Sequence, residues 1–342
     1  MDILILGATS NICATRVFDN LNDLQHEINT IYCYDMKNIT PSIFNQYFLE
    51  NVKLNNKNMI INKIKYIYGN FKESEYINKI IPLMNQKLLI YVAIPPFCYN
   101  HIIDFFNVNN NFYKLILEKP LALNYNCFNS IKTKITNKMF IIDHFLYKKD
   151  IQNIIHKNKD KCIKTIKIKF LYENDVENRL GYFDTVGFFI DMFQSHYLSI
   201  LYSLIGINKT KQLLNMNIKN NIRKQYKNYG GHNNVDTYFY VELNNNDTTY
   251  VFEGGKAMFK EIKEIQINEN IYKINNYNDE YKLFFEDIIH NKVNESFIQH
   301  HDLFWKITEY INNDTKRELK IKYYDKNNKF TNKKNCYIDV IN

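Results

Sequence analysis

Short apolar runs alternate with amphipathic segments through residues 1–145, and this alternation constrains the fold more than any other feature of the sequence. Continuous apolar runs are typical of strands buried in a parallel sheet, and the helical segments between them supply right-handed crossovers. We therefore predict a doubly wound α/β domain here. The predicted strands are Ile3–Leu6, Thr30–Tyr34, Ile64–Tyr68, Leu88–Ala93, Lys114–Leu117 and Met139–Ile142, and the predicted helices include Asn11–Leu24, Glu73–Met84 and Asn124–Ile135.

The pattern changes near residue 145. Lys164–Leu171 alternates with period two, as expected of a half-exposed antiparallel strand. Asp184–Ile205 is predicted to form one long helix, with Asp184 as N-cap and Gly206 as the stop. Residues 146–342 are therefore predicted to form an α+β domain with a largely antiparallel sheet. Its other predicted strands are Asp236–Leu243, Thr248–Phe252, Ile262–Ile267 and Ile271–Ile274, and its other predicted helices are Tyr281–His290 and His301–Ile311.

Composition restricts the class of protein. The net charge is +8, but the lysines are scattered, which favours a Lys-rich composition over a nucleic-acid site, with anionic small ligands as the next interpretation. No apolar run reaches the ~18 residues that a membrane helix needs, and no signal peptide is expected. No pair of cysteines has CxxC spacing, so we expect reduced, buried thiols, a cytoplasmic setting and no metal. The cysteines are Cys13, Cys33, Cys98, Cys127, Cys162 and Cys336.

A candidate nucleotide turn follows the first predicted strand. Gly7 comes directly after Ile3–Leu6, and a predicted helix follows it. In dinucleotide-binding folds such a turn brings backbone N–H groups and a helix N-terminus to the pyrophosphate. We therefore expect residues 1–145 to be a Rossmann dinucleotide-binding domain, although a plain strand–helix turn is the alternative. The candidate cofactor-binding residues of this turn are Gly7, Thr9, Ser10, Asn11 and Ile12.

Further candidates follow other predicted strands, at the edge where ligands bind in such sheets. Asp35 and Lys37 follow the second strand; an acid there favours the ribose hydroxyl of NAD, whereas a cation favours the 2′-phosphate of NADP. Pro95 and Tyr99 lie after the fourth strand, and Lys119 after the fifth. A solvated turn or an ordinary exposed lysine is the alternative interpretation of these residues.

Three polar clusters interrupt apolar segments in the rest of the chain. The first, residues 143–148, contains Asp143, His144 and Lys148; the second begins at residues 181–184 and continues to Asp191 and His196; the third, residues 254–258, contains Lys256. A buried Asp or His needs polar partners. A histidine with a pKa near neutrality suits the base that removes a hydroxyl proton during hydride transfer, and an acid suits its orientation. A lone helical histidine is nevertheless more often a satisfied core residue.

Taken in order, these clusters resemble the glucose-6-phosphate dehydrogenase family. The family signature Arg-Ile-Asp-His-Tyr-Leu-Gly-Lys corresponds to Ile-Ile-Asp-His-Phe-Leu-Tyr-Lys at residues 141–148. The family's Gly-Gly-Tyr-Phe-Asp run and the Gly, Asp and Gln-Asn-His that follow it correspond to residues 181–184, Gly187, Asp191 and residues 194–196. Its Glu-Lys-Pro corresponds to residues 118–120, and its Gly-Lys-Ala-Leu to residues 255–258.

The resemblance implies hydride transfer from C1 of a sugar phosphate, glucose 6-phosphate or a close relative, to NADP, with NAD possible, giving a lactone. It also implies a homodimer. His196 is the implied general base, oriented by Asp143. The implied substrate-binding residues are His144 and Lys148 at the phosphate, Lys119 between substrate and nicotinamide, Asp191 and Lys256 near sugar hydroxyls, and Glu173 beside the position of a family acid.

The sequence departs from the family pattern at both binding regions. Ser10 and Asn11 replace a glycine and an acid of the nucleotide turn. Phe145 replaces a phosphate-binding tyrosine, Tyr147 a glycine and Tyr172 an acid, and the second domain is shortened. Two alternatives therefore stay open: a Gfo/Idh/MocA-type sugar oxidoreductase, and a non-catalytic relative that binds sugar phosphate or nucleotide.

Overall fold

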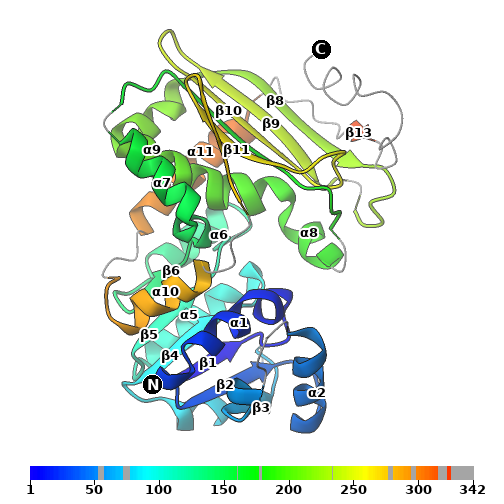
Figure 1. The fold of residues 1–342 in the computed structure, drawn as a ribbon, viewed down its shortest axis with the longest axis vertical. Coiled ribbons are helices and arrows are strands. Elements are labelled where there is room, and N and C mark those ends of the chain that lie inside the picture. Colours follow the sequence, from blue (N-terminus) through cyan, green and yellow to red (C-terminus); the bar gives the residue numbers. More distant parts are fainter. Residues whose placement is uncertain are drawn as a thin grey trace. The chain divides into compact units, whose positions relative to one another are not determined.

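The structure is a computed structural model that describes residues 1–52, 58–71, 78–159, 161–176, 179–232, 234–275, 280–293, 298–314 and 322–324. The chain divides into two compact units (Figure 1). Unit 1 contains residues 1–122, 126–148 and 277–299, and unit 2 contains residues 123–125, 149–276 and 300–342.

Unit 1 is built on a parallel six-stranded sheet with the strand order β3-β2-β1-β4-β5-β6. This is the order of a dinucleotide-binding Rossmann sheet, in which the strand order reverses beside β1. All six predicted strands are confirmed. A strand that is buried on both faces has a continuous apolar sequence, which can be recognised without knowledge of its neighbours. They are β1 (Asp2–Leu6), β2 (Thr30–Asp35), β3 (Ile64–Tyr68), β4 (Leu88–Val92), β5 (Lys114–Leu117) and β6 (Met139–Ile141).

Helices flank this sheet. The helix predicted at Asn11–Leu24 is present as a π-helical turn, η1 (Cys13–Val17), followed by α1 (Phe18–Asp23). Residues 73–77 of the predicted helix Glu73–Met84 lie outside the described residues, and η3 (Ile81–Leu83) is a 3-10 turn. The others are η2 (Gln25–Glu27), α2 (Pro41–Asn51), α3 (Asn58–Ile61), η4 (Pro96–Cys98), α5 (Tyr99–Val108), α6 (Tyr125–Lys132), η5 (His144–Tyr147) and α10 (Glu280–Ile289).

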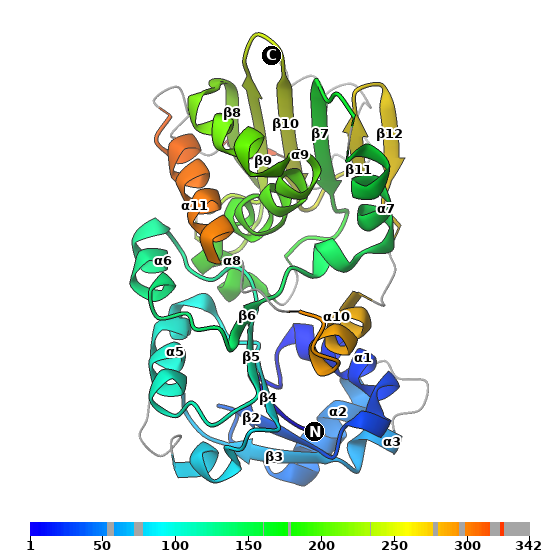
Figure 2. The same ribbon diagram turned by 90° about the vertical axis from the view of Figure 1, so that its left-hand side faces the viewer.

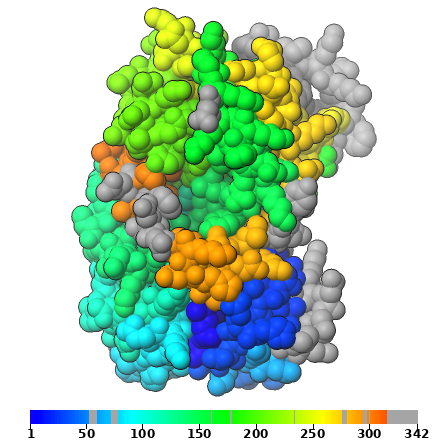
Figure 3. Space-filling view, turned by 60° about the vertical axis from the view of Figure 1, so that its left-hand side comes forward, coloured from blue at the N-terminus to red at the C-terminus, as the bar shows by residue number. Residues whose placement is uncertain are grey.

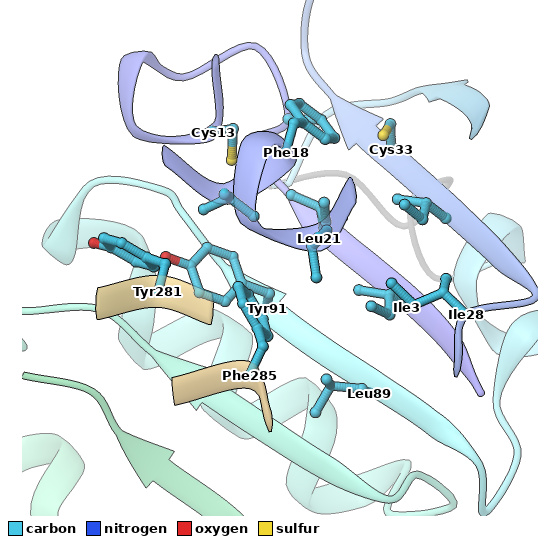
Figure 4. Packing of buried hydrophobic residues seen from close by; sticks show 14 of the residues in the cluster. Ile3, Cys13, Phe18, Leu21, Ile28, Cys33, Leu89, Tyr91, Tyr281 and Phe285 are labelled. Atoms are coloured by element: carbon cyan, nitrogen blue, oxygen red, sulfur yellow. The ribbon is translucent and has the colours of Figure 1, made fainter. Parts of the chain in front are cut away.

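Helix α10 completes the core of unit 1. Tyr281 and Phe285 of α10 pack beside Tyr91 of β4 and Leu21 of α1 (Figure 4). In the space-filling view α10, in orange, lies against the blue N-terminal segment (Figure 3). A single boundary after residue 145 therefore does not describe the chain, because a late segment returns to the first unit.

Unit 2 contains a seven-stranded sheet with the order β12-β11-β7-β10-β9-β8-β13. The prediction of a largely antiparallel sheet is confirmed, but β7 is antiparallel only to β11 and runs parallel to β10. Strand β8 was not predicted, because its asparagines and lysines hide any apolar alternation. The strands are β7 (Thr165–Leu171), β8 (Asn217–Tyr226), β9 (Tyr238–Asn244), β10 (Thr249–Gly255), β11 (Ile262–Ile267), β12 (Asn270–Lys273) and β13 (Lys322–Tyr324).

The single helix predicted at Asp184–Ile205 is wrong. Gly187, with φ of 73°, ends α8 (Leu180–Val186), and Asp184 lies inside that helix. The chain restarts where the carbonyl and carboxylate of Asp236 accept hydrogen bonds from the backbone N–H groups of Phe188 (3.0 Å) and Phe189 (3.3 Å). Gly206, with φ of 75°, kinks α9 (Leu198–Gln212) rather than ending it.

The remaining helices of unit 2 are α7 (Lys149–Asn158), the π-helical η7 (Ile190–Tyr197), η8 (Leu213–Asn215) and α11 (Ile298–Asn312). Helices α7, α9 and α11 lie on one face of the seven-stranded sheet (Figure 2). Aromatic rings of Phe193 and Tyr197 from η7 contact Phe239 and Phe252 of this sheet.

Cysteine burial differs from the prediction. Among the described residues Cys13 and Cys33 are buried, Cys98 is half-buried, and Cys127 and Cys162 are exposed; all five are free thiols. Cys127 is exposed because it lies on the outer face of α6, and Cys162 lies in the segment before β7. Cys336 lies outside the described residues. No described helix is long and apolar enough to span a membrane, and no metal-binding group of three His, Cys, Asp or Glu residues occurs in the same part of the chain.

Candidate active site

Gly7 forms the tight turn between β1 and η1. Its φ is +85°, and a Cβ atom at this position would lie 2.5 Å from the carbonyl oxygen of Ala93. Only glycine combines this left-handed conformation with so close a backbone approach. The Gly7 N–H donates to the carbonyl oxygen of Tyr34 at 2.9 Å, so the turn is fixed to the ends of β2 and β4.

Asp35, at the end of β2, holds the same turn. Its Oδ2 accepts hydrogen bonds from the backbone N–H (2.8 Å) and the hydroxyl (3.0 Å) of Thr9, and its Oδ1 accepts from the Lys37 N–H at 3.2 Å. The residue is only 7% exposed. Three candidate cofactor residues are therefore brought together, and the acid organises the turn, a role that the sequence analysis did not consider.

The other candidates near the nucleotide turn differ in exposure. Asn11 is exposed, Ile12 is half-buried, and Ser10 Oγ accepts a long hydrogen bond of 3.4 Å from the Cys13 N–H. Pro95 is exposed at the carboxyl end of β4. Tyr99 is buried, and its hydroxyl donates to the Glu118 carbonyl oxygen at 2.8 Å. Its hydroxyl thus supports the backbone after β5.

Lys119 and Asp143 form a buried ion pair in unit 1. Lys119 follows β5 and Asp143 follows the neighbouring β6, so both lie at the carboxyl edge of the sheet. Their Nζ–Oδ2 distance is 2.8 Å, and 3% and 6% of the side chains are exposed. Burial lowers the pKa of Lys119, and the Asp143 carboxylate opposes that change. Asp143 Oδ1 also accepts from the Phe145 N–H at 3.1 Å, which caps η5.

Glu118 connects this edge to α10. The hydroxyls of Tyr91 and Tyr281 donate to its Oε1, Tyr281 at 3.0 Å. Burial raises the pKa of Glu118 to about 7, against the effect of the two hydroxyls. The Tyr281 hydroxyl is also 3.2 Å from His144 Nδ1, and the two rings are stacked. Sequence reasoning missed Glu118 and Tyr281; the acid of the Glu-Lys-Pro run was the one available signal.

Lys148 at the end of η5 is also paired with α10. Its Nζ lies 3.0 Å from Glu280 Oε1 and 5.4 Å from the centre of the Phe145 ring. Helix α10 thus contacts both candidate phosphate ligands, His144 through Tyr281 and Lys148 through Glu280. We call Glu118, Lys119, Asp143, His144, Lys148, Glu280 and Tyr281 the unit 1 polar cluster.

A second set of candidates lies in unit 2. His196 is 6% exposed and belongs to η7, a π-helical segment of a kind that often occurs at functional sites. Asp191, in the first turn of η7, accepts a 2.6 Å hydrogen bond from the Tyr182 hydroxyl. Lys256 follows β10, and its Nζ lies 4.5 Å from the centre of the Tyr172 ring.

Two further acids of unit 2, Glu173 and Asp184, were also candidates or part of a candidate cluster. Glu173 is exposed and lies two residues after the end of β7. Asp184, part of the predicted second cluster, accepts a 2.9 Å hydrogen bond from the His232 N–H and therefore fixes a neighbouring loop. The structure thus groups Lys119, Asp143, His144 and Lys148 in unit 1, and Asp191, His196, Lys256 and Glu173 in unit 2.

Two family models match consecutive parts of the chain. The model described as the NAD binding domain of glucose-6-phosphate dehydrogenase matches residues 4–153, and the model of its C-terminal domain matches residues 151–237. The chain belongs to the glucose-6-phosphate dehydrogenase family. The predicted resemblance and the predicted Rossmann domain are therefore confirmed.

Relatives named glucose-6-phosphate 1-dehydrogenase share modest identity with this glucose-6-phosphate dehydrogenase family member. The Buchnera aphidicola (Baizongia pistaciae) protein is 33% identical over 150 residues, which are 39% of this chain and 30% of the relative. The Helicobacter pylori 26695 protein is 27% identical over 324 residues, 80% of this chain and 75% of the relative. The chain thus matches less than a third of the length of the Buchnera protein and three quarters of the Helicobacter protein.

Solved structures share the fold. A glucose-6-phosphate dehydrogenase in complex with glucose 6-phosphate superposes with a TM-score of 0.73 at 16% identity, covering 95% of this chain and 94% of that one. The WlbA dehydrogenase of Thermus thermophilus, solved with NAD and α-ketoglutarate, gives a TM-score of 0.61 at 9% identity, covering 92% and 95%. The architecture is therefore shared with other oxidoreductases, and the family assignment depends on sequence.

Proposed function

We propose that this protein oxidises the C1 hydroxyl of glucose 6-phosphate or a close sugar phosphate, with a nicotinamide dinucleotide as hydride acceptor. The observation that carries the proposal is the unit 1 polar cluster. It places Lys119, Asp143 and His144 directly after β5 and β6, at the carboxyl edge of an NAD-binding sheet. Ligands bind at this edge in doubly wound folds.

The proposed reaction is balanced between substrate, cofactor and one base. The C1 hydride passes to the nicotinamide ring, the C1 hydroxyl loses its proton to His196, and the C1–O bond becomes the carbonyl of a lactone. Imidazole suits this role because histidine is the side chain whose ordinary pKa lies close to neutrality. We further propose that Asp143 assists His196, as the family resemblance implies.

The remaining candidates have binding roles in this proposal. Lys119 contacts substrate and nicotinamide, His144 and Lys148 face the phosphate, and Asp191 and Lys256 contact sugar hydroxyls, with Glu173 nearby. Charge-assisted hydrogen bonds from lysine and histidine suit a phosphate anion. We also propose a homodimer, as the family resemblance implies, and light scattering of the purified protein tests it.

NADP is the proposed cofactor, and NAD is the alternative. Lys37 is exposed beside the turn that Asp35 fixes, and a cation at the end of the second strand favours a 2′-phosphate. The turn residues Gly7, Thr9, Ser10, Asn11 and Ile12 would hold the pyrophosphate, with Pro95 on the neighbouring loop. When bound, the nicotinamide supplies the hydride acceptor; the chain's residues position the sugar and remove the proton.

The test is an assay of purified protein with glucose 6-phosphate and either NADP or NAD, following reduced nicotinamide by absorbance. His196→Asn is expected to abolish turnover. His156→Asn, an exposed histidine of α7 in the same unit, is the matched control and should retain it. Turnover that survives His196→Asn would refute the assigned base. A lack of turnover with every hexose and hexose phosphate would refute the dehydrogenase proposal and leave a binding-only relative.

A further inference from the structure

Lys148, which we propose as a phosphate ligand, is already paired with an acid. Lys148 Nζ lies 3.0 Å from Glu280 Oε1, across 132 residues of sequence. The lysine side chain is 13% exposed, whereas that of Glu280 is 2% exposed. The lysine is thus the more accessible member of the pair.

Glu280 depends on this lysine. Its other oxygen, Oε2, is buried and has no hydrogen-bond partner within the described part of the chain. A buried carboxylate that loses its cation is left uncompensated, which is far more costly than an exposed broken pair. A ligand that draws Lys148 away must therefore replace what Glu280 loses.

A phosphate group cannot make that replacement. It is an anion that carries acceptor oxygens, so beside Glu280 it adds repulsion between like charges. The other lysine of the unit 1 polar cluster, Lys119, is likewise paired with a carboxylate, that of Asp143. The two lysines of this cluster are thus balanced by Asp143 and Glu280. An uncharged hydroxyl group meets no such repulsion.

We propose that Glu280 is a specificity-determining residue that reduces the preference of this enzyme for a phosphorylated over an unphosphorylated hexose. The inference rests on the proposed sugar oxidation. It states that Glu280 and the substrate phosphate compete for Lys148. Lys148 therefore contributes less than about threefold in kcat/KM to the preference for glucose 6-phosphate over glucose.

The decisive variant is Glu280→Gln, which keeps the shape and an oxygen acceptor for Lys148 but removes the charge. It is expected to lower KM for glucose 6-phosphate by about tenfold, with kcat unchanged and with KM for glucose unchanged. Asp287→Asn is the matched control, because Asp287 lies on the same helix and pairs with Lys292 instead. A structural effect of Glu280 would alter both sugars equally.

A second arm uses Lys148→Met. In the wild-type background this variant is expected to change the ratio of kcat/KM for the two sugars by less than about threefold, and in the Glu280→Gln background by about tenfold. If Glu280→Gln does not fold, Lys148→Met alone decides, because a loss of glucose 6-phosphate preference clearly above about threefold would overturn the proposal. An equal KM for glucose 6-phosphate in folded Glu280→Gln and wild type would also overturn it.

Calorimetric titration separates this inference from the proposed function. If the wild type oxidises neither sugar, the proposed function fails, and titration with glucose 6-phosphate still tests Glu280. Tighter binding of glucose 6-phosphate to Glu280→Gln than to wild type, with glucose unaffected, supports the competition for Lys148. Equal binding of glucose 6-phosphate to both proteins refutes it.

Discussion

Lys119 and Asp143 form a 2.8 Å ion pair that is almost fully buried at the carboxyl edge of the unit 1 sheet. The two residues follow adjacent parallel strands, β5 and β6, and lie 24 positions apart in the sequence. The pair therefore joins two strand ends, and Asp143 also caps η5. A substitution at either residue changes the stability of unit 1 as well as any chemistry at this edge.

Asp143→Asn is expected to reduce the free energy of unfolding by about 3–5 kcal/mol, because it leaves the Lys119 ammonium buried without its anion. The amide that replaces the carboxylate would keep an oxygen that can cap η5. The loss of unfolding free energy would therefore come from removal of the negative charge of Asp143. Urea denaturation of Asp143→Asn, Lys119→Met and the double variant measures it. The double variant should lose clearly less than the sum of the single losses; additive losses would show that the pair contributes no coupling.

Gly7→Ala is expected to reduce the free energy of unfolding by at least ~2 kcal/mol, because a Cβ atom would lie 2.5 Å from the Ala93 carbonyl oxygen at a φ of +85°. Gly181→Ala is the matched control. It lies in α8, and a Cβ there meets no atom within 4 Å, so it should be neutral or stabilising by up to ~1 kcal/mol. Thermal denaturation compares the two. Equal effects would mean that Gly7 is not constrained by the neighbouring strand.

The strands of unit 1 could be predicted from the sequence because each apolar run is buried by its neighbours on both faces, so burial is encoded locally. Strand β8 could not, since its ten residues are rich in Asn and Lys and its pairing partners lie elsewhere in the chain. The break at Gly187 was equally hidden. Its cap comes from Asp236, which no local pattern connects to that helix.

Some contacts of the candidate site could likewise be predicted from the sequence, and others could not. Lys119 and Asp143 could be expected near each other, because carboxyl ends of neighbouring parallel strands meet at one edge. Glu280 and Tyr281 could not be expected beside Lys148 and His144, because helix α10 returns to unit 1 from more than 130 residues away. A family motif predicts which residues bind the ligand. It does not predict which residues from distant parts of the chain form ion pairs or hydrogen bonds with them.

Replacement of Glu118 should change how stability depends on pH. Burial raises its pKa from 4.5 to about 7, so the folded state binds the proton more tightly than the unfolded state. The resulting stabilisation is complete below about pH 4.5 and is lost as pH rises through about 7, a change of about 3 kcal/mol. Glu118→Gln removes this titration.

Urea denaturation between about pH 5 and about pH 8 measures the effect. The free energy of unfolding of Glu118→Gln, relative to wild type, should increase with pH across this range. Glu269→Gln, an exposed acid in the turn between β11 and β12, is the control and should show a smaller trend. A difference between Glu118→Gln and wild type that stays constant with pH would contradict the buried, protonated Glu118.

Lys37→Met tests the proposed preference for NADP. The Lys37 Nζ lies 5.1 Å from the centre of the Tyr47 ring, next to the turn that Asp35 fixes, and its side chain is exposed. If this ammonium contacts a 2′-phosphate, the variant should raise KM for NADP about tenfold and leave KM for NAD unchanged. Lys65→Met is a close control. Lys65 lies on β3 and is also exposed, and its Nζ is 5.7 Å from the centre of the Tyr32 ring. Steady-state kinetics with each cofactor measure these KM values. An equal change in KM for NADP and NAD, or the same change in Lys65→Met, would show that Lys37 does not bind the 2′-phosphate.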